Sequence, residues 1–493
     1  VRAEIGGTAP GARGGRVTSP PMKEFFEELD SFVWSIYLLI PLLLGTGLWL
    51  TIRLGFLQLR KLSPAMRLGL VERADEGGEG DISQYQALST ALAATVGVGN
   101  IVGVATALSL GGPGALFWMW VTGLVGMASK YSEAFLGVRF RTVDDAGEQS
   151  GGPQYYLKKA IPNTFGKILA YTFAIFAALA AFGIGNLTQG NAVAGNLEST
   201  FSIDPRITGI VMVLLVGAVL IGGIKAIGKF TAAFVPMMII LYIAASLFVL
   251  ITNIADVPAA FALIFTDAFT GTSAVGGFAG AGIILAIQMG VARGLFSNES
   301  GMGSGGIAAA AAKTTHPVRQ GLVSMTQTFI DTLIVVSFTG LVIITTGTWE
   351  EGSDDAVAMT AHAFQAGLPG EWGAAVVALS IVFFAFSTML GWSYYGERAF
   401  ESLVGRRGTV PYRVLFTLVV YLGAVTELET VWALASALNG LMALPNLIGL
   451  IILSGLIARE TKAYLDFDPQ LRATAKQVAE WERMRPYPTK VGG

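Results

Sequence analysis

Cysteine is absent from the 493 residues, and histidine occurs only twice, at His316 and His362. Without cysteine the chain forms no disulfide and offers no thiolate to an iron–sulfur cluster or a metal. Two histidines argue against a metal centre built from imidazole ligands. The phosphate-binding pattern G-x-x-x-x-G-K-[ST] is missing as well, so the sequence does not support ATP-driven pumping by this chain.

Charge is also scarce. Charged residues make up 13% of the chain and hydrophobic residues 53%, and the mean hydropathy is +0.61. A soluble protein of this size has about twice that charged fraction. The formal net charge of −2 gives no bulk attraction to nucleic acid. These values predict an all-α polytopic membrane protein whose partners include the lipid bilayer and exclude nucleic acid.

Three regions differ in composition. Residues 1–21 are rich in glycine, proline and arginine and lack the apolar core of a signal peptide, so we expect a disordered segment. The chain begins with valine, which suggests a misassigned start and Met22 as the true one. We predict a transmembrane transporter domain over residues 22–460 and a cytoplasmic tail over residues 461–493. Within the tail, residues 475–484 are amphipathic and are expected to lie on the membrane.

Eleven apolar stretches are candidates for membrane-spanning helices. Basic residues gather in every second connection between them, and acidic or neutral residues fill the others. The positive-inside rule then places the N-terminus outside and the C-terminus in the cytoplasm, which requires an odd number of spans. We therefore predict a multi-pass protein of the plasma membrane. The stretches are residues 31–52, 84–110, 114–138, 166–194, 207–223, 230–252, 276–296, 320–346, 372–395, 411–426 and 430–457.

The stretch at 84–110 is uncharged but contains three glycines and Asn100 in its middle. Each glycine costs about 1 kcal/mol relative to alanine in a helix. One interpretation is a tightly packed helix, because Gly99 and Gly103 have the GxxxG spacing. The other is a helix that breaks at mid-membrane, where unwound backbone groups can hold a ligand. The polar Asn100 favours the break.

Residues 276–306 form a second unusual segment, in which Gly290 and Gly294 offer another break point. Arg293 and Glu299 lie beside it and could neutralise each other or seal a gate, although Arg293 could also simply mark the membrane edge. Each interrupted stretch opens a set of five spans, and the two sets have opposite topology. This pattern predicts a 5+5 inverted repeat of the leucine-transporter type, with residues 31–52 as one extra N-terminal transmembrane helix.

Several longer motifs point to a family. They are G-V-G-N-I-V-G-V-A-T-A-L-S-L-G-G-P-G-A-L-F-W-M-W-V (97–121), G-G-P-Q-Y-Y-L (151–157), G-V-A-R-G-L-F-S-N-E-S-G-M-G-S (290–304), H-P-V-R-Q-G-L (316–322) and A-F-S-T-M-L-G-W-S-Y-Y-G-E-R-A-F (385–400). From about Met22 to Glu460 the chain resembles the alanine or glycine:cation symporter family, also called sodium:alanine symporters. The resemblance implies sodium-coupled uptake of small neutral amino acids and the leucine-transporter fold with one extra helix.

An amino-acid zwitterion carries two charges that must not be desolvated unpaired. A half-helix that starts near Gly99 would present free N–H groups to the substrate carboxylate. The absence of a carboxylate from 84–110 suits a neutral substrate. For Gln189 a role as interhelical glue, and for Trp392 a packing role, are alternatives to cavity lining. The expected substrate-binding residues are Thr95, Gly97, Gly99, Asn100, Gln189, Gly290 and Trp392.

A sodium ion prefers oxygen ligands. Resemblance to the second sodium site of the leucine-transporter fold implies four ligands: the carbonyls of Ala93 and Val96 and the hydroxyls of Ser387 and Thr388. The alternative for both hydroxyls is a hydrogen bond to their own helix. Asn100 matches a residue of the first sodium site of that fold, so it is expected to bind either sodium or substrate. No cofactor is expected; sodium serves as the coupling ion.

These expectations describe a sodium-coupled secondary symporter that imports alanine or glycine by alternating access. Proton coupling and passive facilitation are the alternatives. A channel is disfavoured because no repeated polar pore ring is evident. An enzyme is disfavoured because the apolar stretches hold no metal-spaced cluster and no nucleophile–base pair. Alanine, glycine and D-amino acids are equally compatible with the sequence, and any oligomeric state is open.

Overall fold

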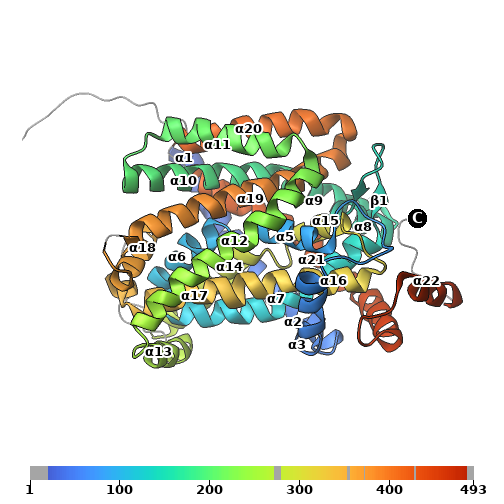
Figure 1. Cartoon of the computed structure of the whole chain (residues 1–493), viewed down its shortest axis with the longest axis horizontal. Coiled ribbons are helices and arrows are strands. Elements are labelled where there is room, and N and C mark those ends of the chain that lie inside the picture. Colours follow the sequence, from blue (N-terminus) through green and yellow to red (C-terminus); the bar gives the residue numbers. More distant parts are fainter. Residues whose placement is uncertain (1–19, 271–278, 352–355, 371, 427–428, 486–493) are drawn as a thin grey trace, which may run out of the picture.

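The computed structural model describes residues 20–270, 279–351, 356–370, 372–426 and 429–485 (Figure 1). The expected disordered segment therefore lies outside the described residues, except that α1 already begins at Pro20. The first half of the chain contains α1 (Pro20–Val33), α2 (Leu39–Arg53), α3 (Leu57–Arg60), α4 (Leu62–Met66), η1 (Arg67–Glu72), α5 (Gln84–Thr95), η2 (Val98–Asn100), α6 (Val102–Gly111), α7 (Gly114–Arg139), β1 (Thr142–Val143), β2 (Gln149–Ser150), α8 (Pro153–Ala160), α9 (Thr164–Phe182), η3 (Gly183–Leu187), α10 (Thr188–Phe201), α11 (Pro205–Leu220) and α12 (Gly223–Thr252).

The second half is helical throughout its described elements and ends in a long helix followed by a short one. These elements are α13 (Val257–Thr270), α14 (Ala279–Asn298), α15 (Ser304–Ala310), α16 (Pro317–Thr328), η4 (Phe329–Val336), α17 (Ser337–Thr345), η5 (Thr348–Glu351), α18 (Ala356–Gly367), α19 (Trp372–Val404), η6 (Arg406–Gly408), α20 (Thr409–Val425), α21 (Glu429–Phe467) and α22 (Ala475–Met484). The only described strands, β1 and β2, form one antiparallel hairpin.

Each of the eleven predicted stretches contains helix, but the number of spans is smaller by length and hydropathy. Among the described residues, six helical segments are long and apolar enough to cross a membrane, or seven if the bent pair of α5 with η2 and α6 counts as one span. Other predicted stretches correspond to short apolar helices such as α2 and α11. The prediction of a polytopic, predominantly helical protein holds, and eleven spans remain a prediction.

The first predicted break is confirmed. Ser83 starts α5 with a capping box, in which its side chain accepts from the Gln86 N–H and the Gln86 side chain accepts from the Ser83 N–H. The helix ends at Thr95, and the chain resumes as η2 and α6 at an angle of 64°. Gly97 between them has an extended backbone. The Asn100 side-chain oxygen accepts the Gly97 N–H at 2.9 Å and so satisfies a donor that the break exposes.

The second break is not where we predicted it. Gly290 and Gly294 lie inside the continuous helix α14, and a Cβ at Gly290 would lie 2.4 Å from the Ala115 carbonyl oxygen of α7. Gly290 therefore allows two helices to approach closely. The chain leaves the helix only after Asn298, where Gly301 and Gly303 have φ of 90° and 92°, a conformation that glycine adopts without steric cost.

Three further differences concern the number and the bounds of the helices. The predicted stretch 31–52 is divided, because α1 ends at Val33 and α2 begins at Leu39. Helices α13 and α18 were not predicted; each is short, and both lie at the same end of the bundle (Figure 1). Helix α21 continues to Phe467, past the predicted domain boundary at residue 460.

The opposite end of the bundle carries the β1–β2 hairpin, α8 and α22 (Figure 1). The amphipathic pattern of α22 suggested that this helix lies on the membrane. Its apolar face instead packs against other helices of the protein. Val478 is buried, and the Trp481 ring stacks on Phe467 at 4.8 Å between centroids. The Glu482 carboxylate also lies 3.2 Å from His316 Nε2. The apolar face of α22 thus packs on the end of α21 because that helix extends far enough to meet it.

A buried arginine ties the hairpin to α19. Arg398 is 1% exposed and forms ion pairs with Asp144 at 2.8 Å, with Glu148 and with Glu401 at 2.9 Å. Burial alone would raise the pKa of Asp144 and Glu148, but the hydrogen bonds and ion pairs outweigh it and lower the pKa of both carboxyls. Their stabilising contribution is therefore present at neutral pH and is lost as the pH falls through the lowered pKa values.

We expect Arg398→Met to lower the thermal stability of the purified protein strongly, by about 3–5 kcal/mol, because it leaves buried carboxylates without their cation. The measurement is thermal unfolding in detergent at neutral pH. The matched control is Lys462→Met, which breaks an ion pair with Asp466 whose side chains are 77% and 65% exposed and which should cost at most about 1 kcal/mol. Equal small losses in the two variants would contradict a structural role for Arg398.

Candidate functional site

The first break is in contact with α19. A Cβ at Gly97 would lie 2.4 Å from Thr388 Oγ1, so the absence of a side chain lets the Thr388 hydroxyl approach the unwound backbone. A Cβ at Gly391, one turn later, would lie 2.6 Å from the Ala94 Cβ. Small residues on both sides thus bring α5 and α19 into close contact at the depth where the backbone is unwound.

Asn100 links this break to η4. Its side-chain oxygen accepts from the Gly97 N–H, and its Nδ2 donates to Asp331 Oδ1 at 2.8 Å. Asn100 and Asp331 are both completely buried. The oxygen of the Asn100 amide therefore satisfies a backbone N–H at the break, and its nitrogen positions the Asp331 carboxylate.

Asp331 was not among the residues predicted from the sequence. Besides Asn100, it accepts from Ser297 Oγ at 2.9 Å and from Thr332 Oγ1 at 2.8 Å. No lysine, arginine or histidine of the described chain lies within ion-pair distance of it. A buried carboxylate held only by neutral donors is costly unless a cation joins it. The signal was present in the sequence, as a single acid in the apolar run F-I-D-T-L-I-V-V of the span 320–346.

Ser297 connects Asp331 with the second break, because it lies one residue before the end of α14. Gln327 adds a further link: its Nε2 donates to Thr95 Oγ1 at 2.8 Å and to the Asn298 carbonyl at 3.3 Å. The Asn298 side chain in turn donates to Thr332 Oγ1 at 3.0 Å. Both interrupted helices and η4 therefore meet in one buried polar cluster.

Three more buried charges lie around the second break. Lys130 Nζ donates to the Glu299 carbonyl at 3.1 Å, and Ser304 Oγ donates to the Glu299 carboxylate. Glu133 accepts from the Gly303 N–H at 2.9 Å. With Asp331, these groups hold three carboxylates and one ammonium, all buried, for a formal net charge of −2. Such a cluster favours the entry of cations.

Arg293 and Glu299 do not neutralise each other as the sequence suggested. Arg293 lies five residues before Asn298, the last residue of α14. Its guanidinium is over the Phe296 ring, 5.9 Å from the centroid, and interacts electrostatically with Asp30 of α1. The Glu299 carboxylate is bound by Ser304 instead. Because α14 continues through Gly294, the Arg293 and Glu299 side chains are separated along the axis of this helix.

The four sodium ligands expected from the resemblance are all buried. The Thr388 hydroxyl, beside Gly97, and the Ser387 hydroxyl both donate to the Phe384 carbonyl at 2.9 Å. Ser387 also contacts the Met238 thioether of α12 at 3.5 Å. Both hydroxyls thus make the hydrogen bond to their own helix that was the alternative. Their oxygen lone pairs stay available, so a sodium site formed with Ala93 and Val96 remains a prediction.

The expected substrate-binding residues fall into three groups. Thr95, Gly97, Gly99 and Asn100 lie together at the first break. Trp392 packs against η3, where a Cβ at Gly185 would overlap it, and Gln189 donates to the Ile184 carbonyl of the same element at 3.0 Å while its Oε1 has no partner among the described residues. Gly290 packs against α7, away from the second break. The roles of these residues in binding remain predictions.

A cavity of about 340 Å³ reaches the first break. Gly99 and Gly103 line one side of it, and Arg293, Phe296 and Trp432 line the other. A Cβ at Gly99 would lie 3.2 Å from the Phe296 ring, so this aromatic side chain covers the unwound backbone. A cavity of this size is large enough for a small amino acid.

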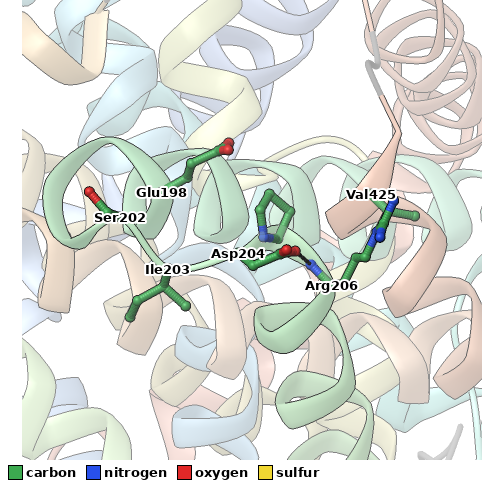
Figure 2. Close-up of a pocket in the computed structure, with 7 residues that line it drawn as sticks. Glu198, Ser202, Ile203, Asp204, Arg206 and Val425 are labelled. Carbon is green, nitrogen blue, oxygen red and sulfur yellow. Dashed lines mark hydrogen bonds between the residues drawn. The ribbon is translucent and has the colours of Figure 1, made fainter. Parts of the chain in front are cut away.

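A larger hollow, of about 690 Å³, lies elsewhere (Figure 2). It is formed by the loop between α10 and α11 and the end of α20, around Glu198, Asp204, Arg206 and Val425. The Asp204 side chain accepts from the Arg206 N–H at 2.8 Å and caps α11. This carboxylate is engaged in a helix cap at the protein surface, and none of the break residues lines the hollow.

The family model described as the sodium:alanine symporter family matches residues 20–479. The sodium/alanine symporter AgcS of Methanococcus maripaludis is 53% identical over 440 residues, which cover 88% of this chain and 96% of that protein. The amino-acid carrier protein AlsT of Bacillus subtilis is 35% identical over 475 residues, covering 94% and 99%. A solved manganese transporter from Eremococcus coleocola covers 76% of this chain and 79% of that chain, with 15% identity and a TM-score of 0.49.

Proposed function

The chain belongs to the sodium:alanine symporter family of multi-pass membrane transporters, and we propose from this premise that it imports a small neutral amino acid together with sodium by alternating access. The observation that carries the proposal is the Asp331 carboxylate, which is buried between the two interrupted helices with three neutral hydrogen-bond donors. Binding of a cation would offset the cost of burying this carboxylate, and we expect it to precede closure of the substrate cavity.

We place one cation at Asp331, where the carboxylate and the Ser297 hydroxyl provide hard oxygen ligands. Ser297 would reorient only slightly, because its hydroxyl already contacts the carboxylate. The site formed by Ala93, Val96, Ser387 and Thr388 is a second candidate for sodium. It lies on the α19 side of the same break, so the two ions would hold α5 between η4 and α19.

We place the substrate over the first break, in the cavity covered by Phe296. The N-terminal end of α6 has backbone N–H groups without intrahelical partners, which suit the carboxylate of alanine or glycine. Gly97 and Gly99 lack side chains that would block that approach, and Thr95 lies in the preceding turn. Gln189 has a buried oxygen without a described partner, and Trp392 of α19 lies against Gly185 of η3; both residues are candidates for a wall of the site. Gly290 is left out because it packs against α7.

We further propose the 5+5 inverted repeat, with α5–α6 and α14–α15 as the interrupted helices that open its halves and α2 outside it. The bent pair α5–α6 and the end of α14 at Gly301 and Gly303, which meet at one polar cluster, support this assignment. The basic connections place the β1–β2 hairpin, α8 and α22 in the cytoplasm and α13 and α18 outside.

The test of the function is uptake of labelled alanine into proteoliposomes under an imposed sodium, potassium or proton gradient. We expect uptake only with sodium. Because sodium enters with a neutral zwitterion, uptake should increase with an inside-negative potential, which contributes about 2.3 kcal/mol per charge at 100 mV. Equal uptake after replacement of sodium at constant pH would exclude sodium coupling and leave proton coupling or passive facilitation, which the proton gradient separates.

We expect Thr388→Ala to raise the sodium concentration for half-maximal transport by about tenfold, because it removes one ligand oxygen worth about 1.4 kcal/mol. Thermal stability should change little, since the lost hydrogen bond runs within one helix. Thr417→Ala is the matched control: its hydroxyl likewise donates to its own helix, at the Arg413 carbonyl. A fall in stability with unchanged sodium dependence would assign Thr388 a structural role only.

A further inference from the structure

A second cavity, of about 270 Å³, lies between α1, α14 and α21. Asp30 and Trp34 of the α1 end, Arg293 and Gln288 of α14, and Ser436 of α21 line it. Arg293 and Phe296 also line the cavity at the first break. These two side chains therefore form the partition between an outer cavity beside α1 and the inner one over Gly99.

Three charged side chains line the outer cavity: the carboxylates of Glu27 and Asp30 and the guanidinium of Arg293. Asp30 and Arg293 attract each other electrostatically, but no ion pair joins them among the described residues. Asp30 Oδ1 is buried and has no hydrogen-bond partner within the described chain. The Ser436 side chain hydrogen-bonds the Asp30 carboxyl group, so Oδ1 is the oxygen left for a donor from outside the protein.

Neighbouring contacts hold these charges in place. The Trp34 indole N–H donates to the Ser436 carbonyl at 3.1 Å and joins the end of α1 to α21. The Arg293 guanidinium lies over the Phe296 ring, 5.9 Å from its centroid, and this cation–π contact restrains it at the partition. The Asp30 carboxylate and the Arg293 guanidinium thus line one cavity from α1 and α14 without an ion pair between them.

We propose that this outer cavity is a second binding site for a zwitterionic amino acid, with the ligand ammonium at Asp30 and its carboxylate at Arg293. A simple anion would meet the repulsion of Glu27 and Asp30, and a simple cation would meet that of Arg293. A zwitterion satisfies both charges at once and has the size of the cavity. The inference rests on the proposed function: the substrate would bind first at the outer site, then pass Phe296 and reach the site at the first break.

The experiment is equilibrium binding of labelled alanine to the purified full chain in lipid nanodiscs, with and without sodium. We expect two alanine molecules per wild-type chain. Asp30→Asn and Arg293→Gln should each weaken one of the two sites by at least about tenfold, because each removes a charged partner. Asn100→Ala should remove the other. Glu28→Gln, an exposed carboxylate on the same helix, is the control and should keep both sites.

Wild-type protein provides a test that needs no variant. Propionate lacks the ammonium and alaninamide lacks the carboxylate, so at matched concentrations both should displace alanine from the outer site at least about tenfold less well than glycine. Saturation of the wild type at one alanine per chain would overturn the outer site. Two sites that Asp30→Asn and Arg293→Gln leave unchanged would overturn it as well. Failure of the proposed function would give a different result: alanine binding at both sites would then be independent of sodium.

Discussion

Asp331→Asn is expected to reduce sodium-dependent alanine uptake by at least about a hundredfold in a protein that still folds. The substitution keeps the size of the side chain and removes its charge. A cation bound at this position would lose a buried ionic partner, which costs about 3 kcal/mol or more. Folding should suffer less, because Ser297 and Thr332 can still donate to the remaining side-chain oxygen.

The measurements for Asp331→Asn are uptake into proteoliposomes and thermal unfolding of the purified protein with increasing sodium. Sodium should stabilise the wild type, because it binds only the folded state, and this effect should be lost in the variant. The control is Asp204→Asn, which changes an exposed carboxylate that caps α11; it should cost little stability, because asparagine caps helices about as well as aspartate, and should not affect sodium dependence. If Asp331→Asn kept the sodium dependence of the wild type, the coupling ion would not bind at Asp331.

Asn100→Ala is expected to abolish both substrate binding and uptake. The amide accepts from the Gly97 N–H and donates to Asp331 Oδ1, so its removal leaves one buried donor and one buried acceptor unsatisfied. Each such group costs about 1–3 kcal/mol. A hydrogen bond that served only to hold two membrane helices together would be worth about 0.6 kcal/mol and would leave a working transporter. The two roles therefore predict effects that differ by orders of magnitude.

Calorimetry of alanine binding to purified protein separates these roles. Asn191→Ala is the matched control, because the Asn191 side chain makes an interhelical hydrogen bond to the Thr426 carbonyl at 3.1 Å, outside the polar cluster. We expect alanine affinity near that of the wild type for this control and no measurable binding for Asn100→Ala. Near-wild-type affinity with unchanged sodium dependence in Asn100→Ala would show that the substrate site does not include this residue.

The two glycine-rich segments show where prediction from the sequence works and where it fails. In 84–110 the glycines cluster around Asn100, and the break occurs there. In 276–306 the glycines have two different roles: Gly290 permits close approach of α7, whereas Gly301 and Gly303 adopt positive φ where the helix ends. Both roles require the absence of a Cβ, so composition alone does not distinguish them.

Composition and motifs by themselves determined that this chain is a helical membrane transporter of the sodium:alanine symporter family with an interrupted helix at residues 95–102. These properties depend on local hydropathy, on helix propensity and on motifs contiguous in sequence. Tertiary structure alone decided that Asn100 meets Asp331, 231 positions later, and that Asp30 of α1 faces Arg293 across a cavity. The physical reason is that a buried charge acquires its function from whatever the fold places beside it, and packing between distant helices, rather than local sequence, selects those neighbours.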